Sequence, residues 1–100
     1  MEVDVDEAEE VVSKEEPSWF SFSRIVKSFD ARPVIEDGEQ PLHRVFTECK
    51  DLQEGEIYEL ITPFLPAPLI ESSRKKGFLV WATEEPEDVF KTYLTQKYKS

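Results

Sequence analysis

The sequence holds few side chains of the types that carry covalent or metal chemistry. Cys49 is its single cysteine and His43 its single histidine. His43 follows Glu39 by four residues, but one imidazole and one carboxylate make an incomplete site, because zinc takes at least three protein ligands. Six residues separate His43 from Cys49, which places the two side chains on different sides of a helix. We therefore expect no metal site, no cofactor and no catalytic residue, and a solvated His43.

A candidate anion site lies where a predicted strand, a loop and a predicted helix meet. Pro41 suits the first turn of a helix, where free backbone amides and the helix dipole attract anions. Arg32 precedes the same loop, and its guanidinium could bind a carboxylate or a phosphate. In the alternative, which we favour, Arg32 pairs with Asp30 or Glu36 at the surface. Glu39, close to the helix start, would also repel an anion.

A second candidate surface is the proline-rich stretch from Pro63 to Pro68. In the interpretation we favour, its prolines fix the route between two elements, and Phe64 and Leu65 anchor the crossover. Alternatively, a stiff loop that carries these two side chains offers a preorganised surface for a ligand or a partner. The residues that we assign to ligand or partner binding on both surfaces are Arg32, Gly38, Glu39, Pro41, Phe64, Leu65, Pro66 and Pro68.

The first elements that would position these residues follow from prolines and hydrophobic periodicity. Residues 25–29 have the short apolar pattern of a strand, which Pro33 ends because proline cannot donate a ladder hydrogen bond. A polar loop through Gly38 follows. Apolar side chains then recur at three- and four-residue spacing from Pro41 to Leu52, which predicts a helix.

The remaining elements complete a β-α-β-α-β-β order. Residues 57–62 are β-prone, residues 66–76 have the start and stop signals of a short helix, and residues 78–83 and 89–95 flank a hairpin connection at 84–88. This order predicts an α/β (α+β) two-layer sandwich with a four-stranded mixed sheet and two helices on one face.

The face of the sheet without helices also carries apolar side chains and needs a cover. The aromatic segment 18–24 contains Trp19, Phe20 and Phe22, which are untypical of a solvated tail. We expect either this segment or a second copy of the chain, in a homodimer, to lie on the open face. The domain itself is assigned to residues 25–98.

Charge is unevenly distributed along the chain. Residues 1–17 contain eight acids and one lysine, so they account for −7 of the formal charge of −10. They hold too few apolar side chains to balance the cost of ordering the backbone, and we predict a disordered acidic leader. Because the basic residues of the domain gather only at residues 74–76, nucleic-acid binding is not expected.

A membrane or secretory role is not expected either. The most apolar window, residues 60–70, is shorter than the roughly 20 residues that span a bilayer, and three prolines interrupt it. A lone cysteine and the absence of a secretory pattern favour the cytoplasm.

Several short segments resemble a known family, the one catalogued as domain of unknown function 2249, within the TusA/SirA-like (sulfur-carrier-like) superfamily. These segments are Gly38-Glu39-Gln40-Pro41-Leu42, Leu52-Gln53-Glu54-Gly55-Glu56, residues 62–70 and Lys76-Gly77-Phe78. The resemblance runs from about Phe29 to about Leu94 and implies a TusA/SirA-like fold. Sulfur carriers of this superfamily carry a persulfide on the cysteine of a Cys-Pro-x-Pro motif, and the resemblance aligns Gly38 with that cysteine.

We therefore expect a small cytosolic binding or interaction module, with a protein partner or a small ligand, that is not itself a sulfur carrier. One alternative is an accessory factor in sulfur or redox metabolism that docks on the partners of TusA-like proteins. A second alternative is an enzyme that acts on a small anionic substrate with Arg32 and Glu39.

Overall fold

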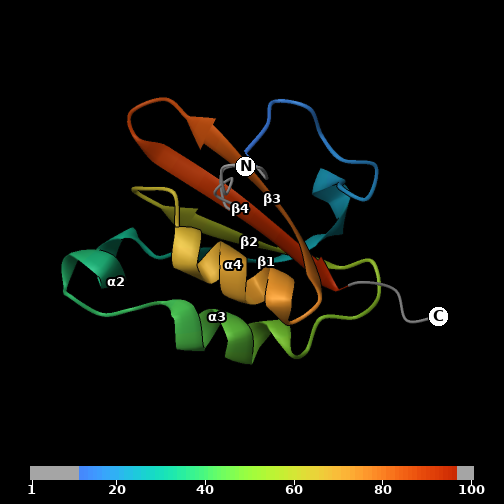
Figure 1. The fold of residues 1–100 in the computed structure, drawn as a ribbon, viewed down its shortest axis with the longest axis horizontal. Helices are drawn as coiled ribbons and strands as arrows, with labels where there is room; N and C mark the ends of the chain where they lie inside the picture. Colours follow the sequence, from blue (N-terminus) through green and yellow to red (C-terminus); the bar gives the residue numbers. More distant parts are fainter. Residues whose placement is uncertain (1–11, 97–100) are drawn as a thin grey trace, which may run out of the picture.

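Four strands form the sheet that the sequence predicts, in a computed structural model that describes residues 12–96 (Figure 1). The strands are β1 (Ile25–Asp30), β2 (Ile57–Thr62), β3 (Phe78–Glu85) and β4 (Val89–Gln96). They lie in the order β1-β2-β4-β3, with β1 parallel to β2 and the other pairs antiparallel. The mixed α+β fold class is confirmed. The predictions for residues 1–11 and for the end of the domain at 97–98 lie outside the described residues.

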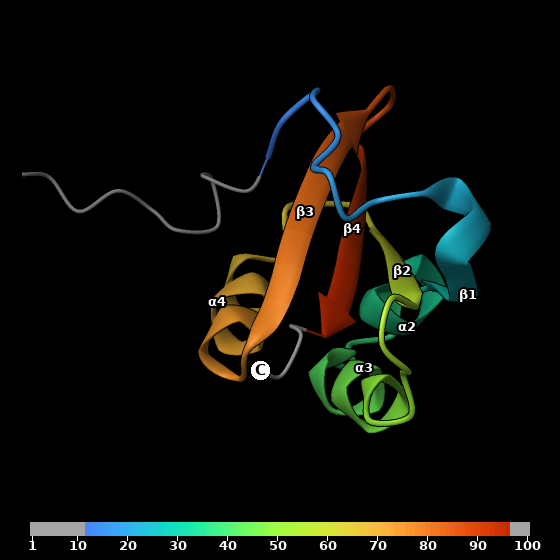
Figure 2. The same cartoon turned by 90° about the vertical axis from the view of Figure 1, so that its right-hand side faces the viewer.

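Two helices cover one face of this sheet, as expected. They are α3 (Leu42–Cys49) and α4 (Ala67–Lys75), and Figure 2 shows both on the same side of the strands. Each begins at a proline, because Pro41 is the N-cap of α3 and Pro66 the N-cap of α4. Gly77 lies just past the end of α4 with a φ of +97°, a conformation that other residues rarely adopt.

A short helix, α2 (Arg32–Glu36), replaces part of the polar loop that we expected after β1. Pro33 ends the strand, but it also lies in the first helical turn, where its missing amide costs nothing. Val34 and Ile35 then pack against the main core. The prediction of a loop at these residues was therefore wrong. A one-turn 3-10 helix, η1 (Phe22–Arg24), is a second short helix that the sequence did not indicate.

The hairpin between β3 and β4 is tighter than predicted. Both strands extend further than the sequence indicated, and β3 continues to Glu85, so only residues 86–88 connect it to β4. Glu87 and Asp88 have φ values of 65° and 61°, which is how so short a connection reverses the chain.

The main core lies between the sheet and the helices. Val45 and Cys49 of α3 pack against Tyr58 and Leu60 of β2 and against Leu94 of β4, and all five are buried. The burial of Leu60 and Leu94 on this side is expected, because side chains alternate between the two faces of a strand and every second one points to the helices.

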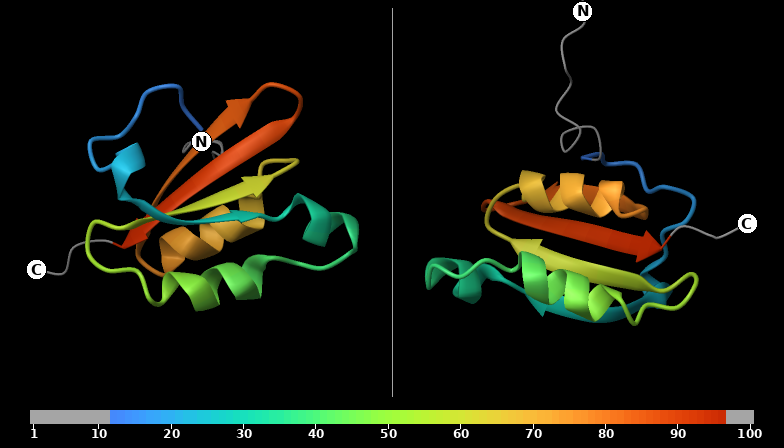
Figure 3. Two further views of the ribbon diagram at one scale, coloured as in Figure 1. Left: turned by 180° about the vertical axis from the view of Figure 1, so that it is seen from behind. Right: turned by 60° about the horizontal axis from the view of Figure 1, so that its bottom comes forward.

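The opposite face carries a second cluster, closed by the chain itself. Phe20 lies with its ring centroid 4.7 Å from that of Trp81 and 4.6 Å from that of Tyr93. Ile57 completes the cluster of buried residues, and Trp19 packs at its edge. Figure 3 shows the segment that precedes β1 lying on the side of the sheet away from α3 and α4. We expected either the aromatic segment or a second copy of the chain to cover this face, and in the structure the aromatic segment covers it.

The residues just before this segment reach the edge of β3. Val12 forms an isolated parallel bridge with Ala82, whose carbonyl accepts a hydrogen bond of 3.1 Å from the amide of Ser13. The indole of Trp81 donates to the carbonyl of Ser13 at 3.1 Å. Residues 12–17 belong to the predicted disordered leader, yet Val12 and Ser13 thus contact the sheet.

Within residues 12–96, none of the helices is long and apolar enough to cross a membrane.

Candidate functional site

Six of the eight residues assigned to binding line one cavity of about 390 Å³, which we call the proline cavity. It is lined by Ile35, Gly38, Glu39, Gln40, Pro41, Leu42, Phe64, Pro66, Pro68 and Leu69. The six predicted residues among them are Gly38, Glu39, Pro41, Phe64, Pro66 and Pro68. Residues of the two surfaces that the sequence indicated separately therefore line one cavity.

The sheet topology brings these surfaces together. Because β1 and β2 are parallel, their carboxyl ends lie at the same edge of the sheet, and the segments that follow them meet there. The first segment is α2 with its loop to α3, and the second is residues 63–66, which lead into α4. Figure 1 shows α3 and α4 starting at the same end of the helix layer.

The lining of the proline cavity is mostly apolar. Ile35, Leu42 and Leu69 reach it from three different helices, and Leu69 is buried in the main core. Phe64 is 49% exposed and forms an open wall. The hydroxyl of Thr62 donates to the carbonyl of Phe64 at 2.6 Å, which fixes the loop in place. The polar side chains of the lining are Glu39 and Gln40, so the interior suits an apolar group.

Arg32 lies outside the proline cavity. Its Nε and Nη2 atoms donate to the two carboxylate oxygens of Asp30 at 2.9 and 2.7 Å. This hydrogen bonding lowers the pKa of Asp30 and raises the pKa of Arg32. The surface pair that the sequence favoured is thus the observed one, and Arg32 is not directed at the start of α3.

Leu65 also lies outside the proline cavity. It packs against the small buried cluster of Ile70 and Ala82, between α4 and β3. Leu65 therefore anchors the crossover, whereas its neighbour Phe64 faces the proline cavity.

Comparison with known families identifies the chain. A family model described as an uncharacterised conserved protein, DUF2249, matches residues 28–95. The chain belongs to the DUF2249 family. No curated protein and no solved structure matches it. The matched range contains every residue of the proline cavity, whereas the aromatic segment at 18–24 precedes it.

In this DUF2249 domain, Gly38 lies in the lining of the proline cavity and carries no thiol. Gly38 has a φ of +89°, which L-residues rarely adopt. The thiol of the single cysteine is elsewhere, because Cys49 is the last residue of α3 and is fully buried in the main core. Burial, and then the charge of Glu48, raises the pKa of Cys49 to about 12. His43 is exposed on the outer side of α3.

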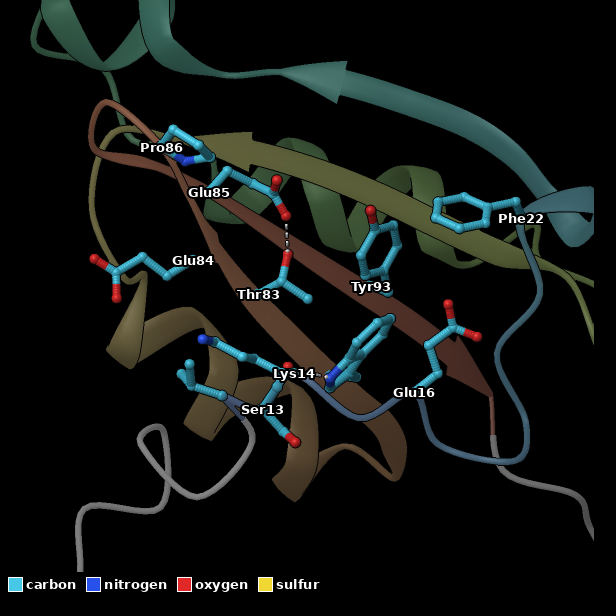
Figure 4. A pocket seen from close by; sticks show the side chains of 11 residues that line it. Ser13, Lys14, Glu16, Phe22, Thr83, Glu84, Glu85, Pro86 and Tyr93 are labelled. Atoms are coloured by element: carbon cyan, nitrogen blue, oxygen red, sulfur yellow. Dashed lines mark hydrogen bonds between the residues drawn. The ribbon is translucent and has the colours of Figure 1, made fainter.

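A larger cavity, of about 820 Å³, lies on the other side of the DUF2249 domain and was not predicted from the sequence (Figure 4). It lies between residues 12–16 and the β3–β4 hairpin, and Phe22 also lines it. Trp81, Thr83 and Glu85 alternate along β3, a spacing that places them on one face of the sheet. That spacing was a readable signal, but nothing in the sequence showed that the leader would form the opposite wall.

Metal ligands are not gathered in either cavity. Across residues 12–96, there is no group of three or more His, Cys, Asp or Glu side chains placed to hold a metal ion.

Proposed function

We propose that this DUF2249 domain is a binding module that holds an apolar group of a partner protein or a small ligand in the proline cavity. The observation that carries the proposal is the convergence of two connections, the α2–α3 loop and the residues before α4, on one apolar cavity. Its volume of about 390 Å³ lies within the usual range for ligand sites in proteins.

The rigidity of the lining supports a recognition role. Pro41, Pro66 and Pro68 have little backbone freedom to lose, and the Thr62 hydrogen bond holds Phe64 in the conformation that forms the wall. A site that is ordered before binding loses less entropy when its ligand arrives. An apolar group of modest size would therefore bind here without a rearrangement of the domain.

The ionisable side chains in and near the proline cavity argue against catalysis on an anionic substrate. Arg32 is held by Asp30, and Glu39 is the one titratable side chain in the lining of the proline cavity. Persulfide transfer is likewise disfavoured, because Gly38 carries no thiol and Cys49 is buried with a raised pKa. These observations favour a module that binds and does not transform its ligand.

An NMR titration with small apolar probes, cyclohexanol and indole, tests the proposal. Binding should shift the amide signals of Ile35, Leu42 and Leu69, and Phe64→Ala should weaken it by about tenfold through loss of apolar contact area. Phe22→Ala is the matched control, because Phe22 is 67% exposed, contacts Phe20 and does not line the proline cavity. The proposal fails if neither probe shifts these signals, or if Phe64→Ala binds as the wild type does.

A further inference from the structure

The larger cavity combines aromatic rings with carboxylates, and we call it the aromatic cavity (Figure 4). Its aromatic side chains are Phe22, Trp81 and Tyr93, and its acids are Glu16, Glu84 and Glu85. Lys14 is the one basic side chain of its lining. Three carboxylates against one ammonium give the aromatic cavity a negative formal charge, so its ligand is expected to be cationic.

The aromatic side chains offer both a rigid floor and an open wall. Trp81 and Tyr93 stack with ring centroids 5.4 Å apart and an interplanar angle of 25°, and both are almost fully buried. The ring of Phe20 packs edge-on against both of them. Phe22 is 67% exposed, so most of its ring surface is accessible to a ligand. The exposed face of the Phe22 ring carries negative charge density, which attracts cations.

Glu85 and Glu16 lie on the side of this floor, whereas Glu84 points away from it (Figure 4). Thr83 donates to Glu85 at 2.8 Å and so fixes the position of that acid. Burial raises the pKa of Tyr93, its hydrogen bond to Glu59 raises it further, and the charges of Glu85 and Glu16 act in the same direction. Acids from the hairpin and from the leader thus both act on the Tyr93 hydroxyl.

These observations distinguish between kinds of cation. The acids are not grouped to hold a metal ion within residues 12–96. A charge spread over methyl groups, in contrast, suits a wide cavity that has both aromatic rings and carboxylates. The side chain of Lys14 already brings one ammonium group to the lining of the cavity. We propose that the aromatic cavity binds an organic cation, a quaternary or methylated ammonium group.

Choline and its uncharged analogue 3,3-dimethyl-1-butanol provide the direct test with the full chain, because they differ in charge and hardly in shape. In NMR titrations, choline should shift the indole N–H signal of Trp81, which can be assigned with Trp19→Phe. The neutral alcohol should bind about tenfold more weakly or not at all. Equal affinities for the two compounds, or no shift with choline, would overturn the proposal.

Substitutions at exposed positions separate charge recognition from simple apolar contact. Phe22→Leu keeps apolar volume but removes the ring, and it should weaken choline binding by about threefold. Glu16→Gln should weaken it and Lys14→Gln should strengthen it, each by about threefold. Glu87→Gln is the matched control, because Glu87 is an exposed acid of the same hairpin outside the cavity lining. Unchanged affinity in both Phe22→Leu and Glu16→Gln would contradict the proposal.

A trimethyllysine-containing peptide, compared with its unmodified form and with choline, identifies the source of the cation. Stronger binding of the methylated peptide than of choline would assign the group to a partner protein. Stronger binding of choline would assign it to a free small molecule. Either result supports the proposal, and failure of both ligands to bind would refute it.

Discussion

Burial decides the chemistry of the individual side chains in this protein. Cys49 is a thiol by type, but it is fully buried and adjoins Glu48, so its pKa rises from an ordinary value of 9.0 to about 12. Tyr58 is buried beside it and donates to Glu48 at 2.6 Å. Arg44 donates to the same carboxylate at 3.0 Å. These residues form a structural cluster at the end of α3, and none of them lines the proline cavity.

The buried thiol should be chemically inert in the folded protein. At pH 8, reaction of Cys49 with a disulfide reagent such as DTNB should be at least about a hundredfold slower than in denaturant, because thiolate formation is suppressed and access is closed. The absorbance of the released thiolate measures the rate, and Cys49→Ala provides the blank. Rapid release from the native protein would mean that Cys49 is accessible, and it would reopen the question of sulfur chemistry.

The Tyr58 hydroxyl should contribute a pH-dependent part of the stability. Its hydrogen bond is the largest cause of the lowered pKa of Glu48, and a lowered pKa stabilises the fold only above the ordinary value of 4.5. Tyr58→Phe should therefore lower the free energy of unfolding by about 1–2 kcal/mol at pH 7 and by less at pH 3. Urea unfolding at the two pH values measures both numbers. An equal loss at both would show that packing, and not the ionised acid, is responsible.

At the scale of elements, prolines made much of the fold predictable. Pro41 and Pro66 marked the starts of both long helices correctly, since only a helix start tolerates them. The helix α2 was missed because its five residues are too few for a periodicity to be recognised. Residues of the proline cavity could be named from the sequence, but their convergence required the parallel pairing of β1 with β2. The sequence likewise allowed either Asp30 or Glu36 as the partner of Arg32, and the structure shows Asp30.

The aromatic segment before β1 should be a structural part of the domain although it lies outside the family match. Phe20→Ala removes a ring that is 7% exposed, and we expect the free energy of unfolding to fall by about 3–4 kcal/mol. Phe22→Ala, two residues away and 67% exposed, should cost less than about 1 kcal/mol. Urea denaturation followed by tryptophan fluorescence compares them. Similar losses for the two variants would mean that Phe20 does not hold the sheet face as the structure indicates.

For the whole molecule, contacts between distant parts of the chain were the least predictable. The sequence showed that the second sheet face needed a cover, but it could not choose between the aromatic segment and a second copy. That choice depends on Phe20 fitting against Trp81 and Tyr93, more than 60 residues later in the chain. The aromatic cavity was missed for the same reason, because its walls come from residues 12–16 and from the hairpin. Local patterns carry no information on which of these distant surfaces meet.

The ionisable groups together predict a stability plateau with two limits. Burial is the largest cause of the raised pKa values of Cys49, Tyr58 and Tyr93, whose ordinary values are 9.0 and 10.0, so their contribution is complete below about pH 9 and is lost as the pH rises further. The pKa values of Asp30 and Glu48 are lowered, mainly by hydrogen bonds from Arg32 and Tyr58, so their contribution is present above about pH 5 and is lost as the pH falls.

Urea unfolding between pH 3 and pH 11 should therefore give a constant free energy of unfolding from about pH 5 to pH 9 and a decline on both sides. The alkaline decline should be shallower in Cys49→Ala, measured relative to its own plateau, because that variant has one fewer buried group to ionise. The acid limb of the same variant should keep its slope and thus serves as an internal control. A wild-type stability that stays level up to pH 11 would show that these three side chains ionise as freely in the folded state as in the unfolded chain.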